Sequence, residues 1–312
     1  MHVPGPEEEK KPECVIPRIR AMFGQGRDFA LEWVSAHTFQ CRRMQHFRHG
    51  RLLFVGDAAH QVSPFGAGGA NSGLQDIDKL VWKLKLMLDG LAPHSLLDTH
   101  TAERAAAADA NILNSTRSTD FITPKSRTSK TFRNQVLALA KHHPFARKLV
   151  NSGRLSVPSF LTGSMLNTPD ADAFAGNMVP GAPMDDAPVQ VDGQDAWLLD
   201  QVGKGFQLLL FVDAAPSPDV LAQLASCSSA PLRANAAVQV TPLIVAPSPL
   251  NIPGIQVIID AQGLVAKRYD AQPGTAYLLR PDQHVLARWR TLDSARLQAA
   301  LARALGQFSP QA

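Results

Sequence analysis

The residues of this chain that could do chemistry lie close together, between positions 52 and 73. Asp57 directly follows an apolar run at residues 52–55. The next segment carries four glycines, Gly66, Gly68, Gly69 and Gly73. A carboxylate at the end of a strand can accept hydrogen bonds from sugar or ribityl hydroxyls, and glycines let a ligand approach the backbone closely. This spacing predicts a ligand-binding loop.

Two regular elements are expected to hold this loop. Residues 52–55 are continuously apolar, which is typical of a strand buried on both faces of a parallel sheet. After the loop, Asn71 or Ser72 can cap a helix, which Gly90 would stop. Its apolar residues recur at steps of three and four and form one expected buried face, namely Leu74, Ile77, Val81, Leu84 and Leu88. The helix N-terminus would stabilise negative charge on a ligand.

The same stretch resembles the FAD-dependent aromatic hydroxylases of the para-hydroxybenzoate and phenol hydroxylase type. The resemblance is carried by GDAAH at residues 56–60, by Pro64, by the glycine loop ending in Asn71, and by LQDIDKLVWKL at residues 74–84. It implies a monooxygenase that uses FAD, NAD(P)H and O2 to hydroxylate a small aromatic, phenolic substrate, with the flavin supplying the chemistry.

Roles in cofactor binding follow from this resemblance for six residues, Gly56, Asp57, Pro64, Gly69, Ala70 and Asn71. The aspartate of the GD pair would hold the ribityl chain of FAD, and the proline would lie beside the flavin ring and the substrate. Backbone groups of residues 69–71 would hydrogen-bond the pyrimidine end of the isoalloxazine. Two positions depart from the family pattern: Lys79 stands where relatives have Asn, and Gly68 where many have a longer side chain.

Candidate substrate contacts are His37, Phe39 and Phe65. Residues 29–44 alternate well enough for an extended strand, which in the hydroxylase interpretation ends the substrate-domain sheet and points His37 and Phe39 into a pocket. A half-buried sheet position is the alternative for either side chain. His46 and His49 lack a third ligand of suitable spacing, so no metal site is expected. No residue, His60 included, is assigned as an acid, base or nucleophile.

In such a flavoprotein, a unit made of a strand, a GxGxxG turn and a helix should hold the FAD pyrophosphate. This sequence contains no such unit. We therefore expect an incomplete hydroxylase, for which a separate N-terminal half would supply the dinucleotide fold. One alternative is a non-catalytic remnant with little FAD affinity, which Lys79 favours. An NAD-linked dehydrogenase is a second alternative, but its acidic ribose-reading residue is missing after the glycine loop.

The expected fold class is α/β (α+β), in two parts. Residues 1–165 would form the C-terminal part of the FAD-binding and substrate-binding domain, residues 166–187 a linker, and residues 188–312 a domain whose strands and helices follow a thioredoxin-like order. That domain has only Cys227 and no CxxC pair, which excludes dithiol chemistry. Packing or homodimerisation is its expected role.

Composition excludes several other classes of function. A net charge of +4 without a basic block interleaved with aromatics argues against nucleic-acid binding. Three separated cysteines fit a reducing compartment better than a disulfide framework. No apolar segment reaches the length of a signal sequence or a membrane span. A cytoplasmic location is expected by default.

Overall fold

The computed structural model describes residues 5–24, 26–65, 68–150, 159–227, 229–233 and 236–307, which form two compact units, 1–40 and 41–312. The first unit contains α1 (Pro6–Glu9) and α2 (Pro12–Phe23), so the helix expected at residues 12–22 is confirmed. The strand expected at residues 29–44 is wrong, because only Arg42 and Arg43 are paired there. Without a partner strand, the alternating side chains stay exposed, among them Trp33 and Phe39.

Two short antiparallel ladders open the second unit. β1 (Arg42–Arg43) pairs with β4 (His60–Gln61), and β2 (Arg48–His49) pairs with β3 (Leu52–Leu53). The 3-10 turn η1 (Gly56–Ala58) connects β3 to β4. The buried parallel strand expected at residues 52–55 is therefore wrong: in the described part of the chain, its first two residues pair with β2 alone and Leu52 is exposed.

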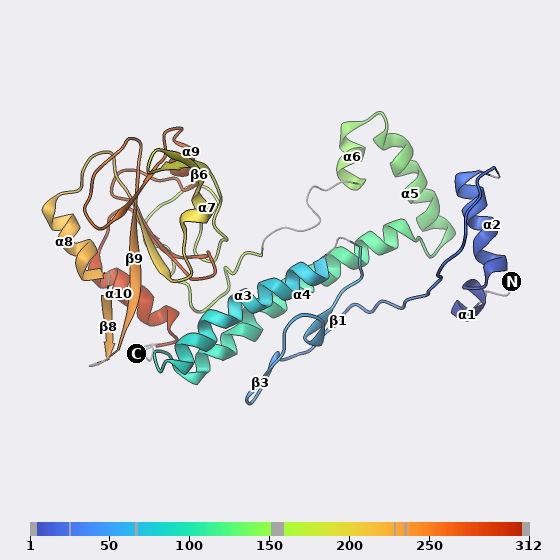
Figure 1. Ribbon diagram of the computed structural model, residues 1–312, viewed down its shortest axis with the longest axis horizontal. Helices are drawn as coiled ribbons and strands as arrows, with labels where there is room; N and C mark the ends of the chain where they lie inside the picture. The colour runs from blue at the N-terminus through green and yellow to red at the C-terminus, as the bar shows by residue number, and fades with distance from the viewer. Residues whose placement is uncertain are drawn as a thin grey trace. The chain divides into compact units, whose positions relative to one another are not determined.

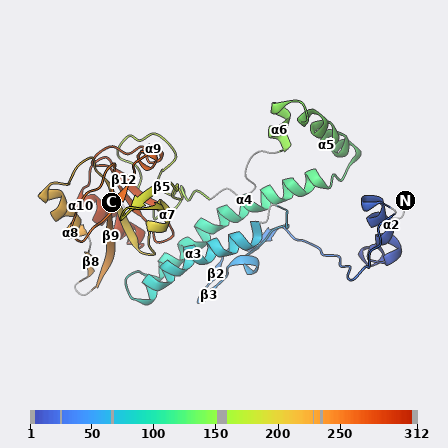
Figure 2. The same cartoon turned by 45° about the horizontal axis from the view of Figure 1, so that its top comes forward.

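Two long helices lie side by side after these ladders (Figures 1 and 2). They are α3 (Gly68–Leu88) and α4 (Asp98–Ile122), joined through η2 (His94–Leu97). The chain continues into α5 (Arg127–Ala140) and α6 (Pro144–Val150). One helix was expected over residues 131–149; the break comes before Pro144, whose ring cannot continue a helix.

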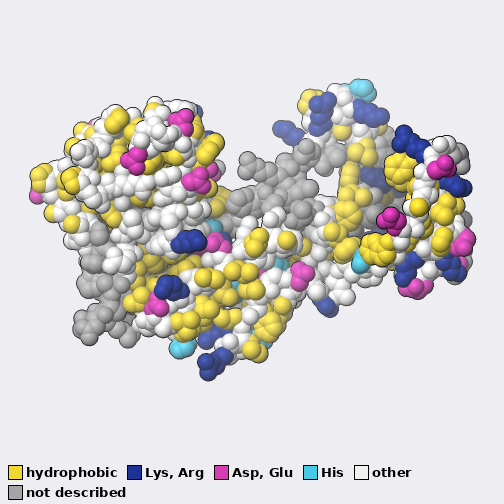
Figure 3. Space-filling model, viewed as in Figure 1, with side chains coloured by type: hydrophobic (Ala, Val, Ile, Leu, Met, Phe, Trp, Pro, Cys, Tyr) yellow, Lys and Arg dark blue, Asp and Glu magenta, His cyan; other side chains and the backbone are white. Residues whose placement is uncertain are grey.

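The expected burial of α3 is inverted. Its buried side chains include Asp76, Lys79 and Lys83, whereas most of the expected apolar face is exposed, with Leu74 66% and Leu88 71% accessible. Figure 3 shows hydrophobic side chains gathered on the surface along this helix. The helix buries charge because α4 and the C-terminal sheet present complementary charges to that side.

An eight-stranded sheet dominates the C-terminal part. Its strands run in the order β12-β11-β7-β9-β10-β5-β6, with β8 paired to β9. β7, β9 and β10 are parallel to one another, and the remaining pairings are antiparallel. The strands are β5 (Pro188–Val191), β6 (Gln194–Trp197), β7 (Phe206–Phe211), β8 (Ser229–Arg233), β9 (Ala236–Ala246), β10 (Gln256–Ile259), β11 (Ala276–Leu279) and β12 (Val285–Trp289).

Four helices accompany this sheet, α7 (Leu198–Gln201), α8 (Pro218–Cys227), α9 (Leu264–Arg268) and α10 (Ser294–Ala304). The sequence predicts the central strands, the final hairpin, α8 and α10 at these places, and the α+β fold class is confirmed. A thioredoxin-like assignment and the domain boundaries stay predictions. Residues 166–187, expected as a linker, pack along β12, where Thr168 and Gly181 donate backbone hydrogen bonds to Leu286 and Val285.

Both faces of the sheet are covered, and helix α3 reaches one of them. Side chains of β7 alternate, so that Leu208 packs in one apolar core and Leu209 in the other. Trp82 of α3 belongs to the first core, where its ring meets Phe206 edge to face at 5.9 Å. The helical hairpin is therefore attached to the sheet by packing as well as by charge.

Candidate functional site

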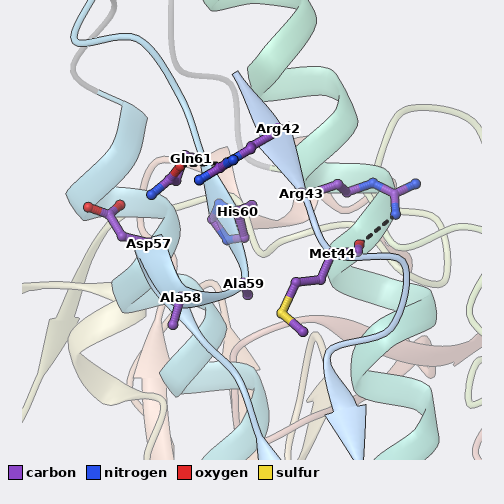
Figure 4. A pocket seen from close by; sticks show the side chains of 8 residues that line it. All are labelled: Arg42, Arg43, Met44, Asp57, Ala58, Ala59, His60 and Gln61. Carbon is purple, nitrogen blue, oxygen red and sulfur yellow. Dashed lines mark hydrogen bonds between the residues drawn. The ribbon is translucent and has the colours of Figure 1, made fainter. Parts of the chain in front are cut away.

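A cavity of about 370 Å³ opens beside Asp57 (Figure 4). It is lined by residues of β1, η1 and β4 and their neighbour Met44, namely Arg42, Arg43, Met44, Asp57, Ala58, Ala59, His60 and Gln61. Arg42 donates to the Gln61 side chain at 3.0 Å, and Arg43 turns to Asp109 at 2.6 Å. The Asp57 carboxylate is exposed and has no hydrogen bond or ion pair to the described residues, so it is open to a ligand.

The turn that presents Asp57 depends on two glycines. Gly56 has φ +57°, a left-handed conformation that favours glycine. Gly73 of α3 packs against it, because a Cβ placed on Gly73 would lie 3.2 Å from the Gly56 Cα. These two glycines let the turn lie on the backbone of α3. The sequence predicts that a ligand approaches the glycine backbone, whereas the structure shows Gly56 against Gly73.

A buried acid of α3 fixes the same turn. Asp76 Oδ2 accepts the Gly56 backbone N–H at 2.9 Å and bonds His60 Nε2 at 2.7 Å, while Oδ1 accepts Arg104 Nε at 2.5 Å. Burial raises the pKa of Asp76, but these donors and the Arg104 charge outweigh it and leave that pKa below its usual value. Asp76 is therefore ionised, and His60 Nε2–H is the donor.

Sequence reasoning missed Asp76 and left Arg104 open. Glu103 and Arg104 resemble the ER pair of the hydroxylases, with a solvated helix face as the alternative, and both side chains are buried. That alternative is wrong for these two residues. His60, which the sequence leaves without a catalytic role, is a buried partner of Asp76. Asp76 of α3 and Arg104 of α4 form a buried ion pair. Their opposite charges on two consecutive helices were the signal that the sequence offered.

The first turn of α3 contains the three residues expected to bind the flavin through their backbone. The helix begins at Gly68, so Gly69, Ala70 and Asn71 lie inside it and the cap expected at Asn71 or Ser72 is wrong. The first four N–H groups of a helix have no acceptor within it and carry its positive dipole end. Turn η1 contacts this helix further along, at Gly73 and Asp76.

The remaining predicted residues are placed less closely. Pro64 and Phe65 are exposed on the segment that leads to α3, and Gly66 of the glycine loop lies outside the described residues. His37 and Phe39 belong to the first unit and are exposed, with His37 Nε2 bonded to Ser35 Oγ at 2.8 Å. Asp57 belongs to the second unit, and the contact of His37 and Phe39 with substrate stays a prediction.

A second buried ionic cluster lies next to the first one and is centred on Glu103, the residue before Arg104 in α4. The Glu103 carboxylate accepts from Lys83 Nζ at 2.6 Å, Ser164 Oγ at 2.6 Å and Arg280 Nη1 at 2.6 Å. Burial opposes the charge of Glu103, yet Arg280 and Lys83 hold its pKa well below the usual range. Burial lowers the pKa of Lys83 to about 8 against the attraction of Glu103.

The described residues offer neither a metal site nor a membrane span. No group of three or more His, Cys, Asp or Glu side chains there could hold a metal ion. None of the helices described is both long and apolar enough to cross a lipid bilayer.

Comparison with protein families places the site in context. Residues 2–115 match the family described as FAD binding domain. Over 264 residues, 80% of this chain, the sequence is 31% identical to a 3-(3-hydroxy-phenyl)propionate/3-hydroxycinnamic acid hydroxylase of Mycolicibacterium gilvum, covering 44% of that protein. Over 98 residues it is 45% identical to a probable NADH-specific resorcinol 4-hydroxylase of Rhodococcus jostii, covering 31% of this chain and 18% of that protein.

A solved structure shows the same fold. The flavin-dependent monooxygenase PieE, in complex with FAD and substrate, matches 98% of this chain and 56% of its own with a TM-score of 0.70 and 24% identity. This chain thus spans about half the length of the proteins that it matches over most of its own residues.

Proposed function

We propose, because this chain is related to the FAD-dependent aromatic hydroxylases, that it forms the isoalloxazine-binding part of a monooxygenase acting on a phenolic compound with NAD(P)H and O2. The similarity to an NADH-specific resorcinol hydroxylase supports a nicotinamide donor. A dinucleotide-binding half with a GxGxxG turn, which this sequence does not contain, would bind the FAD pyrophosphate.

The difference between two neighbouring acids carries this proposal. Asp76 is 0% exposed and its carboxylate is occupied by Gly56, His60 and Arg104. Asp57 is exposed at the cavity edge, and no described residue bonds to it. A carboxylate that the fold presents without an internal partner fits the ribityl hydroxyls of FAD, which donate hydrogen bonds.

The surroundings of Asp57 also fit a flavin. Gly56 and Gly73 meet backbone to backbone, which lets the turn that carries Asp57 lie directly on α3. The first-turn amides of α3 at residues 69–71 suit the electron-rich pyrimidine end of the ring. These features are the ones that a flavin needs on its isoalloxazine side.

Each residue then has a defined task. Asp57 would hold the ribityl chain, and the amides of residues 69–71 would stabilise negative charge on the pyrimidine. Pro64 would lie beside the flavin ring and the substrate, while His37, Phe39 and Phe65 would contact the aromatic substrate. When bound, the flavin supplies reduction by NAD(P)H and oxygen transfer. The protein contributes position, electrostatics and shelter from solvent.

FAD binding by the full chain tests the proposal. Purified protein is titrated against FAD, and quenching of flavin fluorescence gives the dissociation constant. We expect saturable binding that Asp57→Ala weakens at least tenfold, since an anionic acceptor is lost. Asp89→Ala is the matched control, because Asp89 pairs only with Lys85 on the surface of α3 in the described structure.

Two outcomes would count against this assignment. Equal affinity of wild type and Asp57→Ala would remove Asp57 from the site. Absence of binding by a folded wild-type chain would favour a second candidate function, a non-catalytic module that binds a partner or dimerises. Burial of Lys79, at the position where relatives have Asn, favours that candidate.

A further inference from the structure

A residue of the C-terminal sheet reaches the helical hairpin through charge. Arg280, directly after β11, donates Nη1 and Nη2 to the two oxygens of Glu103 at 2.6 and 3.0 Å. The same guanidinium also donates Nε to Asp282 Oδ1 at 3.0 Å and Nη2 to Asp282 Oδ2 at 2.8 Å. Arg280, Glu103 and Asp282 are each at most 4% exposed. This fork geometry fixes direction as well as distance.

The next residue of α4 continues the contact toward the cavity. Arg104, adjacent to Glu103, donates Nε to Asp76 Oδ1 and Nη2 to Ser72 Oγ at 3.1 Å. Asp76 in turn accepts the Gly56 N–H, and Gly56 precedes Asp57. The path from Arg280 to Asp57 therefore runs through the adjacent residues Glu103 and Arg104 of α4. It continues through the Asp76 carboxylate of α3 to the Gly56 N–H.

We propose that Arg280 is a positioning residue: by fixing Glu103 it sets the placement of α4, and through Arg104 and Asp76 it orients the turn that presents Asp57. The sheet domain would thus hold the cavity in shape from a distance. The proposal extends the proposed function by giving the C-terminal domain a part in flavin binding.

Burial makes this path stiff. A charge taken from water needs partners with good geometry, and removal of one partner leaves an uncompensated charge. Without Arg280, Glu103 keeps Lys83 and Ser164, which lie on α3 and before the sheet. The carboxylate would then turn toward Lys83 or water, and α4 would follow. Because Arg104 is the next residue, its contact with Asp76 would loosen in the same movement.

Hydrogen exchange of the Gly56 amide tests the path without any flavin. In the full chain, mass spectrometry follows peptides covering residues 54–62, in which the Gly56 N–H has Asp76 as its acceptor. We expect Arg280→Met to speed exchange there about tenfold, while peptides of β7 stay protected. Arg280→Lys, which keeps the charge but not the fork, should restore only part of the protection.

Arg288→Met is the matched control. Arg288 lies on β12 of the same sheet, is equally buried and pairs with Asp170 at 2.6 Å, but has no contact with α4 among the described residues. Faster exchange at residues 54–62 in Arg280→Met alone supports the proposal. Equal exchange in both variants overturns it, as does acceleration that includes β7, which would mean general loosening.

Two further measurements keep the result clear. If Arg280→Met does not fold, Glu103→Gln tests the same path, because it removes the charge and keeps the shape. It should also accelerate exchange at Gly56, and unchanged exchange would overturn the proposal. FAD titration of the wild type and of Arg280→Lys tests the proposed function separately from the exchange experiment. If the wild type binds no FAD, the proposed function fails, but hydrogen exchange at Gly56 still decides whether Arg280 is a positioning residue.

Discussion

Gly56 donates its backbone N–H to Asp76 Oδ2 across 2.9 Å, although the two residues are 20 positions apart. The turn before Asp57 is thus held by a carboxylate of the following helix. The same carboxylate neutralises Arg104 and orients His60. Asp76 therefore connects α3, α4 and the turn beside the cavity.

Asp76→Asn should destabilise the chain by about 3–5 kcal/mol, because Arg104 would keep a buried charge without its counter-ion. Urea unfolding followed by circular dichroism gives the free energy of unfolding. Asp109→Asn is the control: Asp109 also pairs with an arginine, Arg43, but is largely exposed, so its loss should cost less than about 1 kcal/mol. Similar costs for the two variants would mean that Asp76 is not the anchor described.

Gly73→Ala should weaken FAD binding more than it changes stability. A helix-interior Ala gains up to about 1 kcal/mol over Gly, which offsets the strain of a Cβ 3.2 Å from the Gly56 Cα. The turn must give by a few tenths of an ångström, and this displaces Asp57. Gly68→Ala has open space around its Cβ and should leave affinity unchanged. A Gly73→Ala protein with wild-type affinity would show that the contact is not needed.

Acid should destabilise the chain through His100. Burial first, and the Lys83 charge next, lower the pKa of His100 to about 4 from an ordinary 6.5. Between these pH values the unfolded state binds the proton that the folded state refuses, so stability falls as pH falls. The expected loss from pH 7 to pH 4 is about 3 kcal/mol for this group, at 1.36 kcal/mol per unit.

Comparison of His100→Asn with wild type isolates that contribution. The free energy of unfolding, measured at pH 7 and pH 4, should fall less in the variant by about the same 3 kcal/mol, whereas His49→Asn, at an exposed position, should follow wild type. Parallel pH profiles for wild type and His100→Asn would contradict the low pKa.

The two faces of α3 should respond oppositely to truncation. Leu80 is 8% exposed and Leu74 is 66% exposed. Leu80→Ala should cost about 2–3 kcal/mol by loss of buried contacts, and Leu74→Ala should stay within about 0.5 kcal/mol. Chemical unfolding at low protein concentration measures both. A larger cost at Leu74 would mean that another surface covers the apolar face in solution.

The sequence sufficed where a local pattern decides the structure. Continuous apolar strands such as β7 and the amphipathic α10, whose Leu297 and Leu301 are buried, follow from periodicity and caps alone. These features depend on neighbours within a few residues, which the sequence displays directly.

Long-range neutralisation decided the rest. The charged side of α3 is buried because Arg104 pairs with Asp76 from 28 positions away and Glu103 pairs with Lys83 from 20 positions away. Arg280 completes the second cluster through Glu103, 177 positions away, and periodicity cannot reveal such partners. The prediction of a buried strand at residues 52–55 was wrong because burial also depends on distant partners. The described chain places no neighbouring strands there except β2. Asp76 was missed because an acid within an amphipathic pattern is ordinarily solvated.

The contact between Glu103 and Arg280 also sets an order of events during synthesis. The partners are 177 residues apart, and ribosomes add about 5–20 residues per second. Roughly 10 to 35 s pass between the emergence of Glu103 and that of Arg280. During this interval the hairpin can form its own ion pairs, Lys83 with Glu103 and Asp76 with Arg104, but Glu103 still lacks Arg280. Docking of the sheet onto the hairpin is therefore expected to be a late step of folding.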